Sequence, residues 1–334
     1  MAFKKIINDP YKVVDEMVEG IVLAHHDILK FANNNKRAVV RKDSPVKDKV
    51  GILIGGGSGH EPAFVGYVGK GLADGAAIGN VFASPSPDPV VEATKAINGG
   101  KGVVYMYGNY AGDIMNFDMA AELCSAEDIP VKTILVTDDI ASAKIENKKD
   151  RRGVAGDFYV FKIAGACAEA GASLDDVFKT AIEANDNIRT LGVALSPCIL
   201  PEAGKPTFEI NDDEIEIGMG IHGEPGIKRE KLRPANDLVD DLYKRIMNDS
   251  KLKNNDNIAI MINSLGATPL EELYIISKRV NENLSNSKIN NVKTYVGRYA
   301  TSMEMAGMSI TTLKLSDNLK KNLFAKSECP FWNN

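Results

Sequence analysis

Residues 50–62 read VGILIGGGSGHEP, and this stretch decides the fold class. Its apolar half, Val50–Ile54, predicts a buried β-strand. The glycines that follow predict a tight turn, because glycine adopts backbone angles that other residues avoid. The turn delivers His60 to the end of the strand, which is where α/β proteins hold their ligands. We therefore expect the His60 imidazole to be exposed to a cleft.

Strands and helices alternate around this stretch. Further strands are expected at 102–107 and 133–137, and helices at 89–97, 116–126, 157–170 and 174–185, with Ser173 as the N-cap of the last helix. The first 35 residues are expected to form an amphipathic helix with Val13, Met17, Ile21 and Leu23 on one side. The alternation predicts an α/β fold in α/β/α layers, with largely parallel or mixed sheets.

From residue 187 the pattern changes to short strands separated by turn residues. Strands are expected at 193–195, 207–210, 215–217 and 258–262, helices at 232–247 and 270–284, and a final strand-turn-helix unit at 296–307. We place a boundary at this change. It divides the chain into an N-terminal α/β domain, residues 1–186, and a C-terminal α/β domain, residues 187–334.

The composition is that of a globular protein, with 44% hydrophobic and 25% charged residues among 334. A net charge of -5 with interspersed signs argues against direct nucleic-acid binding, which needs clustered lysine and arginine. The short basic run at 148–152 is expected to be a solvated loop. With no membrane-length apolar stretch and no signal-peptide core, the protein is expected to be cytoplasmic, without membrane contact.

The four cysteines, Cys124, Cys167, Cys198 and Cys329, are far apart in the sequence. This spacing predicts reduced thiols rather than disulfides. It also gives no neighbouring ligands for a metal ion, so no metal site is expected.

Two of the four histidines stand in matching surroundings. His60 and His222 are both flanked by glycine and followed by a Glu-Pro pair, in the strings GHEP (59–62) and GIHGEPG (220–226). His25 and His26 lie inside the predicted N-terminal helix, where packing or surface roles are favoured. A structural role would be a fair hypothesis for either glycine-flanked histidine alone. The shared context favours chemistry at both.

Asp113 ends the string GNYAGD (108–113), directly after a predicted strand. A carboxylate at such a place can orient a histidine or act as a general base. The alternative is that Asp113 caps a helix that begins near Met115, which is a common role for aspartate. Both hypotheses stay open on the local sequence.

Three familiar motifs fail on inspection. Residues 218–223 fit GxGxxG, but a turn follows them where a dinucleotide site requires a helix. The glycines at 55–59 lack the GxxxxGK[ST] pattern of a phosphate loop. A hydrolase built from Ser58, His60 and Asp113 is disfavoured, because residues two apart on a tight turn rarely meet in triad geometry, and the GxSxG elbow is absent.

Taken together, these segments resemble the substrate-binding K subunit of dihydroxyacetone kinase, the bacterial kinase that is fed by the phosphotransferase system. The resemblance covers nearly the whole chain, in family order. It is carried by GGGSGHEP (55–62), FASP (82–85), NYAGD (109–113), NF (116–117), RRGVAG (151–156), GIHGEPG (220–226) and TSMEMAG (301–307).

The resemblance implies a dimeric two-domain α/β subunit that holds dihydroxyacetone, or a similar short ketose, as a covalent hemiaminal on His222. His60 and Asp113 fall on the family's acid/base pair, and Gly57 and Ser84 fall on its substrate pocket. The family also implies a separate partner subunit that carries ADP and Mg²⁺ and is recharged by a phosphocarrier protein. No cofactor is therefore expected on this chain.

The sequence departs from the family pattern around Asp113. Gly108, a substrate-pocket position, replaces a lysine that usually precedes the Asn-Tyr pair; Asn80 replaces an acidic residue and Ala111 a threonine. Two hypotheses follow, a working kinase subunit and a paralogue that senses dihydroxyacetone as co-activator of a TetR-type transcription factor. We favour the kinase, because its three chemical residues are all present. The preferred ketose stays open.

Overall fold

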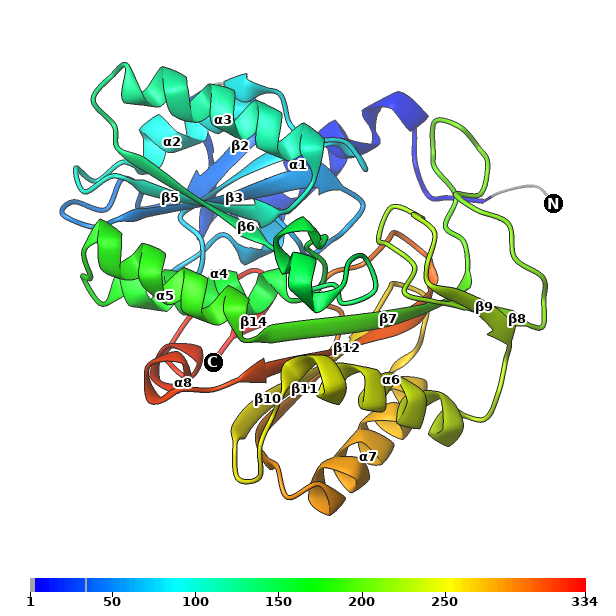
Figure 1. Ribbon diagram of the computed structural model, residues 1–334. Coiled ribbons are helices and arrows are strands. Elements are labelled where there is room, and N and C mark those ends of the chain that lie inside the picture. The colour runs from blue at the N-terminus through cyan, green and yellow to red at the C-terminus, as the bar shows by residue number, and fades with distance from the viewer. Residues whose placement is uncertain (1–3, 34) are drawn as a thin grey trace.

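The computed structural model describes residues 4–33 and 35–334, which form two six-stranded sheets (Figure 1). The first sheet has the strand order β1-β2-β4-β3-β5-β6, with bounds β1 Leu29–Ala32, β2 Asn35–Arg41, β3 Gly51–Ser58, β4 Gly75–Val81, β5 Val103–Gly108 and β6 Val131–Val136. Strands β4, β3, β5 and β6 pair in parallel, while β1 and β2 pair antiparallel at one edge.

The second sheet is mostly antiparallel and has the order β11-β10-β12-β7-β8-β9. Its strands are β7 Ile188–Ser196, β8 Glu214–Ile217, β9 Lys228–Lys231, β10 Asn257–Ser264, β11 Asn290–Gly297 and β12 Ala306–Lys314. Among these described strands, only β10 and β11 pair in parallel. The predicted α/β fold with mixed sheets is therefore confirmed.

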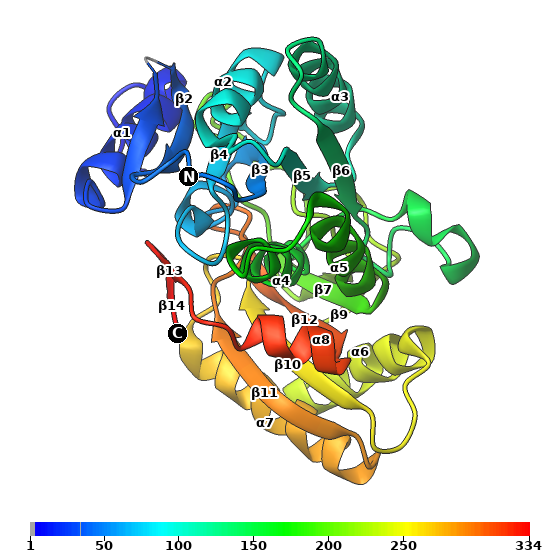
Figure 2. The ribbon, with the colours of Figure 1, turned by 90° about the vertical axis from the view of Figure 1, so that its left-hand side faces the viewer.

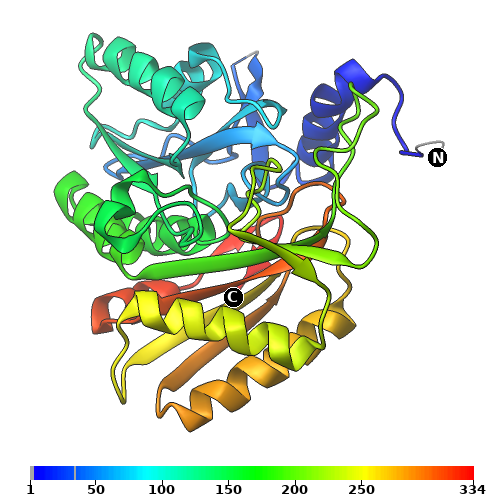
Figure 3. The ribbon, with the colours of Figure 1, turned by 45° about the vertical axis from the view of Figure 1, so that its right-hand side comes forward.

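Helices and sheets alternate in layers (Figures 1 and 3). The helices α2 Pro87–Ile97 and α3 Ala111–Ser125 cover the outer face of the first sheet, and α6 Ala235–Ser250 and α7 Leu270–Asn286 cover that of the second. The helices α4 Asp157–Glu169 and α5 Leu174–Asp186 lie between the two sheets. Every residue of α4 from Asp157 to Ala168 is buried, including the charged side chains of Asp157 and Lys162.

The C-terminal segment returns to the first half of the chain (Figure 2). Helix α8, Asp317–Leu323, packs on α4 and α5, and the hairpin of β13 Glu328–Cys329 and β14 Trp332–Asn333 follows it. The buried Lys162 of α4 donates from Nζ to the carbonyl oxygens of Asn322 at 3.0 Å and Ala325 at 2.7 Å. This buried ammonium fixes the end of α8 against the layer between the sheets.

The predicted N-terminal helix is too long. Helix α1 covers Val13–Ala24, and the chain then turns into β1, which pairs with β2. Leu23, expected on the apolar side, is exposed. Residues 1–3 and 34 of the predicted helix lie outside the described residues. The tertiary context decides the structure here, because residues 29–32 pair with β2 and bury Leu29 and Ala32 in the core.

Two expectations in the second half are also wrong. Residues 207–210 form no strand, and residues 296–307 hold no helix; there, β11 ends at Gly297 and the chain loops into β12 at Ala306. The remaining predicted elements are present with shifted ends, and Ser173 caps α5 as expected, because its side chain accepts from the Asp176 N–H. The predicted boundary at 187 falls between α5 and β7. That each side is an independent domain stays a prediction.

All four cysteines are free, as the spacing predicted, and all four are buried. Within residues 4–33 and 35–334, none of the helices combines the length and apolar character that crossing a bilayer requires.

Candidate functional site

Strand β3 ends at Ser58, and a bend at Gly59 brings in His60. Gly59 has a φ of +98°, and a Cβ atom there would lie 2.6 Å from Cε1 of Phe82. Glu61 fixes the bend, because its carboxylate accepts the Gly59 N–H at 3.0 and 3.2 Å. The first Glu of the two Glu-Pro pairs therefore holds the turn that carries a histidine.

The expectation that His60 is open to a cleft is wrong, because the side chain is only 2% exposed. The loop between β11 and β12 covers it. His60 Nδ1 lies 2.8 Å from the carbonyl oxygen of Thr301, the Thr301 N–H donates back to the His60 carbonyl at 3.2 Å, and the Met303 N–H donates to Gly59 at 2.7 Å. The two halves of the chain are joined directly at this turn.

His222 lies on the loop 218–226 that joins β8 to β9. Glu224, the glutamate of the second Glu-Pro pair, contacts both the backbone and the ring of His222. Its Oε2 accepts the His222 backbone N–H at 3.0 Å, and its Oε1 lies 2.9 Å from His222 Nδ1. A side chain at Gly220 would collide with this carboxylate. The glycine before the histidine thus makes room for the group that orients its ring.

The two histidines meet although 162 residues separate them. His60 Nε2 and His222 Nε2 are 3.0 Å apart, with the rings at 73° to each other. The ring of Phe82 stacks on His60 at 5.0 Å, and Tyr110 packs against the edge of His222 at 4.8 Å. Phe82 has a φ of +55°, an unusual value for a bulky residue and one that concentrates at functional sites.

Asp113 lies in the first turn of α3, which begins at Ala111. The hypothesis that Asp113 caps this helix is wrong, because Tyr110 occupies the N-cap. The carboxyl is 9% exposed, and its Oδ1 has no hydrogen-bond partner among the described residues. Burial raises the pKa of Asp113 to about 6, although a hydrogen bond with Ser84 and the charge of His222 oppose the rise. A carboxyl with this pKa can exchange a proton near neutral pH.

Two of the substrate-pocket candidates, Gly57 and Ser84, belong to segments that pack against each other. A Cβ atom on Gly57 would lie 2.6 Å from the Ala83 nitrogen, so the missing side chain lets the segment with Ser84 pack on β3. Ser84 Oγ accepts from Asn116 of α3 at 3.2 Å. Ser84 is thereby held beside the first turn of α3.

Gly108 ends β5 beside the ring of Tyr110. A Cβ atom on Gly108 would lie 2.9 Å from Cε2 of Tyr110, whose hydroxyl donates to the Gly153 carbonyl at 2.9 Å. The space next to Gly108 is thus filled by an aromatic ring. Ser58 takes no part in the site, since its Oγ donates to the Gly79 carbonyl at 2.9 Å. This contact counts against the hydrolase alternative.

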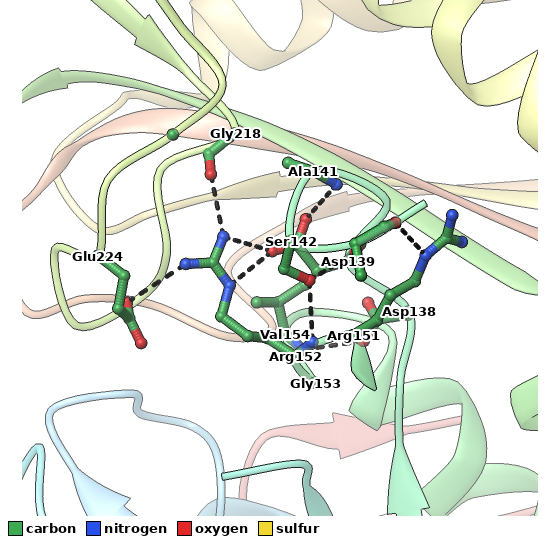
Figure 4. A network of polar contacts seen from close by, with 12 residues as sticks. Asp138, Asp139, Ala141, Ser142, Arg151, Arg152, Gly153, Val154, Gly218 and Glu224 are labelled. Atoms are coloured by element: carbon green, nitrogen blue, oxygen red, sulfur yellow. Dashed lines mark hydrogen bonds and ion pairs between the residues drawn. The ribbon is translucent and has the colours of Figure 1, made fainter. Parts of the chain in front are cut away.

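The basic run at 148–152 is solvated only in part: Lys149 and Asp150 are exposed, whereas the two arginines pair with acidic residues. Arg151 is fully buried and pairs with Asp249 at 2.6 Å. Arg152 contacts the loop 218–226 that carries His222 (Figure 4). Its guanidinium donates to the Gly218 carbonyl at 3.1 Å and comes within 4.0 Å of Glu224, and it also lies 2.7 Å from Asp139. Buried arginines need such partners, because an unpaired buried charge is costly.

Burial and neighbouring groups shift the pKa values of the histidine and the glutamate in the site. Loss of solvent and the charge of His222 lower the pKa of His60 to about 3. Burial acts in the opposite direction on Glu224, but the hydrogen bonds from His222 hold the pKa of this carboxyl at about 2. His60 is therefore neutral and Glu224 is a carboxylate near neutral pH.

The sequence assigned no role to Glu224, Arg152 or Thr301, although their segments carried the resemblance. For Glu224 a signal was present, since both glycine-flanked histidines are followed by Glu-Pro. For Arg152 and Thr301 no local pattern points to the site. Each reaches it from an element that is distant in the sequence.

The fold and the site define a layered α/β protein in which two halves of one chain bring two histidines together, with the buried carboxyl of Asp113 near enough for the charge of His222 to act on it. The family described as "Dak1 domain" matches residues 19–331, and the chain belongs to that family. It is 48% identical to PTS-dependent dihydroxyacetone kinase 2, dihydroxyacetone-binding subunit DhaK, of Listeria innocua, over 98% of this chain and 99% of the relative.

Two solved structures contain the fold of this chain. The native dihydroxyacetone kinase of C. freundii has a TM-score of 0.91 and 34% identity, and the match covers 100% of this chain and 60% of that one. The dihydroxyacetone kinase operon co-activator Dha-DhaQ has a TM-score of 0.89 and 33% identity, over 96% and 98% of the two chains. The family resemblance drawn from the sequence is confirmed.

Proposed function

We propose that this chain captures dihydroxyacetone, or a similar short ketose, as a covalent hemiaminal on Nε2 of His222. The observation that carries the proposal is the contact between His222 Nδ1 and Glu224, at 2.9 Å. A carboxylate there accepts the Nδ1 hydrogen, which leaves Nε2 as the nitrogen that can attack a carbonyl carbon. The Listeria relative is named a dihydroxyacetone-binding subunit, and this supports the choice of ligand.

Covalent capture explains how a small, polar ligand is selected. Glycerol has the same carbon skeleton as dihydroxyacetone but no carbonyl, so it cannot form the adduct. Hydrogen bonds alone discriminate poorly between such similar polyols in a permissive pocket. An imidazole that adds only to a carbonyl group distinguishes the ketone from the polyol by its reactivity.

We propose that the captured ketose is then phosphorylated, with this chain as the substrate-binding subunit of a kinase. In this proposal Asp113 accepts the proton of the terminal hydroxyl as that oxygen attacks a phosphoryl group, and its pKa of about 6 suits a general base. The phosphoryl donor would be held by a partner subunit that carries ADP and Mg²⁺. The PTS-dependent kinase subunit from Listeria supports this assignment.

A reconstitution experiment tests this proposal. The purified chain is mixed with a nucleotide-holding subunit and its phosphodonors, and the formation of dihydroxyacetone phosphate is measured. Turnover that depends on this chain and is abolished in His222→Ala supports the kinase. Retention of the ketone on His222 without any turnover would overturn the kinase assignment and leave the capture intact.

The second candidate function is that of a dihydroxyacetone sensor. The specific observation is the match to the co-activator Dha-DhaQ over nearly the full length of both chains. In this role the captured ketone would favour a conformation that binds a transcription factor of the TetR type, and the DNA contacts would belong to that partner. Ketone-dependent co-purification with such a regulator supports this candidate, while ketone-independent or absent association counts against it.

A further inference from the structure

Each imidazole of the site turns Nδ1 towards an oxygen that can only accept a hydrogen bond. His60 Nδ1 lies 2.8 Å from the carbonyl oxygen of Thr301, and His222 Nδ1 lies 2.9 Å from Glu224 Oε1. A carbonyl oxygen has no hydrogen to give, and neither has the carboxylate of Glu224, whose pKa is held at about 2 by the hydrogen bonds from His222. Both Nδ1 atoms therefore carry a hydrogen.

This assignment has a consequence for the other two ring nitrogens. A neutral imidazole with a hydrogen on Nδ1 has a bare lone pair on Nε2. The Nε2 atoms of His60 and His222 face each other at 3.0 Å, which is a hydrogen-bond distance. Two bare lone pairs would repel at this distance, so a third hydrogen is required between the rings.

We propose that the ligand-free site stores one proton between the Nε2 atoms of His60 and His222, and that capture of a ketone uses this stored proton instead of one from solvent. The second half of this inference rests on the proposed hemiaminal chemistry. Its first half concerns the ligand-free protein alone. Burial lowers the pKa of His60 to about 3, so this ring does not hold the proton by itself near pH 7.

The charges that act on this imidazole pair, His60 and His222, come from three segments. The loop 218–226 contributes Glu224, whose carboxylate balances the added positive charge at 2.9 Å. Helix α3 contributes Asp113, and burial raises the pKa of its carboxyl. Arg152 lies 4.0 Å from Glu224, but its own charge is paired with Asp139. The surroundings therefore favour one cation in the pair.

The stored proton balances the chemistry of capture. As a ketone enters, the proton moves to Nε2 of His60, and the freed lone pair of His222 Nε2 forms a bond to the carbonyl carbon. The electron pair of the C=O π bond moves to the oxygen, which takes the proton from His60. The positive charge stays on the substituted His222 ring beside Glu224, and His60 returns to its neutral form. No proton is exchanged with solvent.

The ligand-free prediction can be tested by nuclear magnetic resonance without any substrate. A His25→Gln/His26→Gln variant leaves the pair as the only imidazoles in the chain. In this variant, labelled with ¹⁵N-histidine, we expect three nitrogen-bound hydrogens on the two rings near pH 7. The third should correlate with an Nε2 atom. Only two such hydrogens, with both Nε2 atoms bare, would overturn the proposal.

The capture prediction is tested by titration calorimetry with dihydroxyacetone in buffers of different ionisation enthalpy. We expect the observed binding heat to be independent of the buffer, which corresponds to no net proton uptake. An uptake of about one proton would overturn the inference. If the proposed function itself is wrong, dihydroxyacetone does not bind at all, or it still binds to His222→Ala. The magnetic resonance experiment does not depend on that outcome, because it uses no substrate.

Two glutamine variants test whether the carboxylate of Glu224 is what holds the third hydrogen between the rings. In Glu224→Gln the countercharge is gone, so the third hydrogen should disappear and any residual capture should take up about one proton. Glu216→Gln is the control, because Glu216 also bonds the loop, through the Gly226 N–H at 2.7 Å, but does not contact the imidazole pair. It should match the parent in both measurements. A third hydrogen that persists in Glu224→Gln would refute the role of this carboxylate.

Discussion

Replacing Asp113 with asparagine should stabilise the protein at neutral pH while it stops phosphoryl transfer. Burial raises the pKa of Asp113 from 3.8 to about 6, so ionising this carboxyl is harder in the folded protein than in the unfolded chain. At about 1.4 kcal/mol for each pH unit, the difference between the two values corresponds to about 3 kcal/mol. This is a ceiling, because the carboxyl has a hydrogen bond with Ser84 that the substituted amide would have to replace.

The sign of the effect follows from proton binding. Between pH 3.8 and 6 the folded state holds the Asp113 proton more tightly than the unfolded state, so stability falls as the pH rises through this window. The full cost is present above pH 6 and absent below 3.8. Asp113→Asn removes the cost, so the variant should match the parent near pH 4 and exceed it near pH 8.

The assay is urea unfolding of both proteins at the two pH values, followed by circular dichroism. Asp118→Asn, an exposed carboxylate on the same helix α3, serves as the control and should change stability by less than about 0.5 kcal/mol. A variant that is less stable than the parent at pH 8, or equally shifted at both pH values, would refute the reasoning. The same variant should retain captured dihydroxyacetone but show no turnover in the reconstituted kinase.

Three further outcomes are expected. His222→Ala should abolish retention of dihydroxyacetone, and undiminished retention, measured by equilibrium dialysis, would remove this residue from the mechanism. Gly57→Ala should weaken capture at least about tenfold, because its Cβ would lie 2.6 Å from the Ala83 nitrogen; Gly20→Ala, which meets nothing within 4 Å, is the control and should leave capture unchanged. Turnover should rise with pH through about 6, as Asp113 loses its proton and can act as a base; an initial-rate profile that is flat from pH 5 to 7 would contradict that role.

The sequence alone predicted the layered architecture, because hydrophobic periodicity and glycine turns are local signals. It placed the buried strand at 50–54 and most of the helices, and the glycine-flanked His and Glu-Pro context singled out His60 and His222. Prediction from the sequence failed for segments whose strand partners lie far away in the chain. Residues 29–32 were expected to be helical, and so was the end of the unit at 296–307. Pairing of β1 with β2 and of β12 with β7 decides otherwise.

The burial of the site was equally beyond local patterns. His60 was expected to be open, but the loop that carries Thr301 covers it from the other half of the chain. The basic run was expected to be solvated, but Arg151 and Arg152 find acidic partners on distant elements. Charge on a short segment predicts exposure only when no complementary charge folds onto it.

The identity of the chemical groups was thus determined by the sequence, and their meeting was decided by the tertiary structure. Residues near in the chain dictate a turn, a cap or a strand, because backbone geometry acts over a few residues. A contact such as the one between His60 and His222 spans 162 residues, and it exists only because two sheets pack around shared helices and bring their loops together. The same packing removes water from the site, and that loss of solvent gives Asp113 and His60 their shifted pKa values.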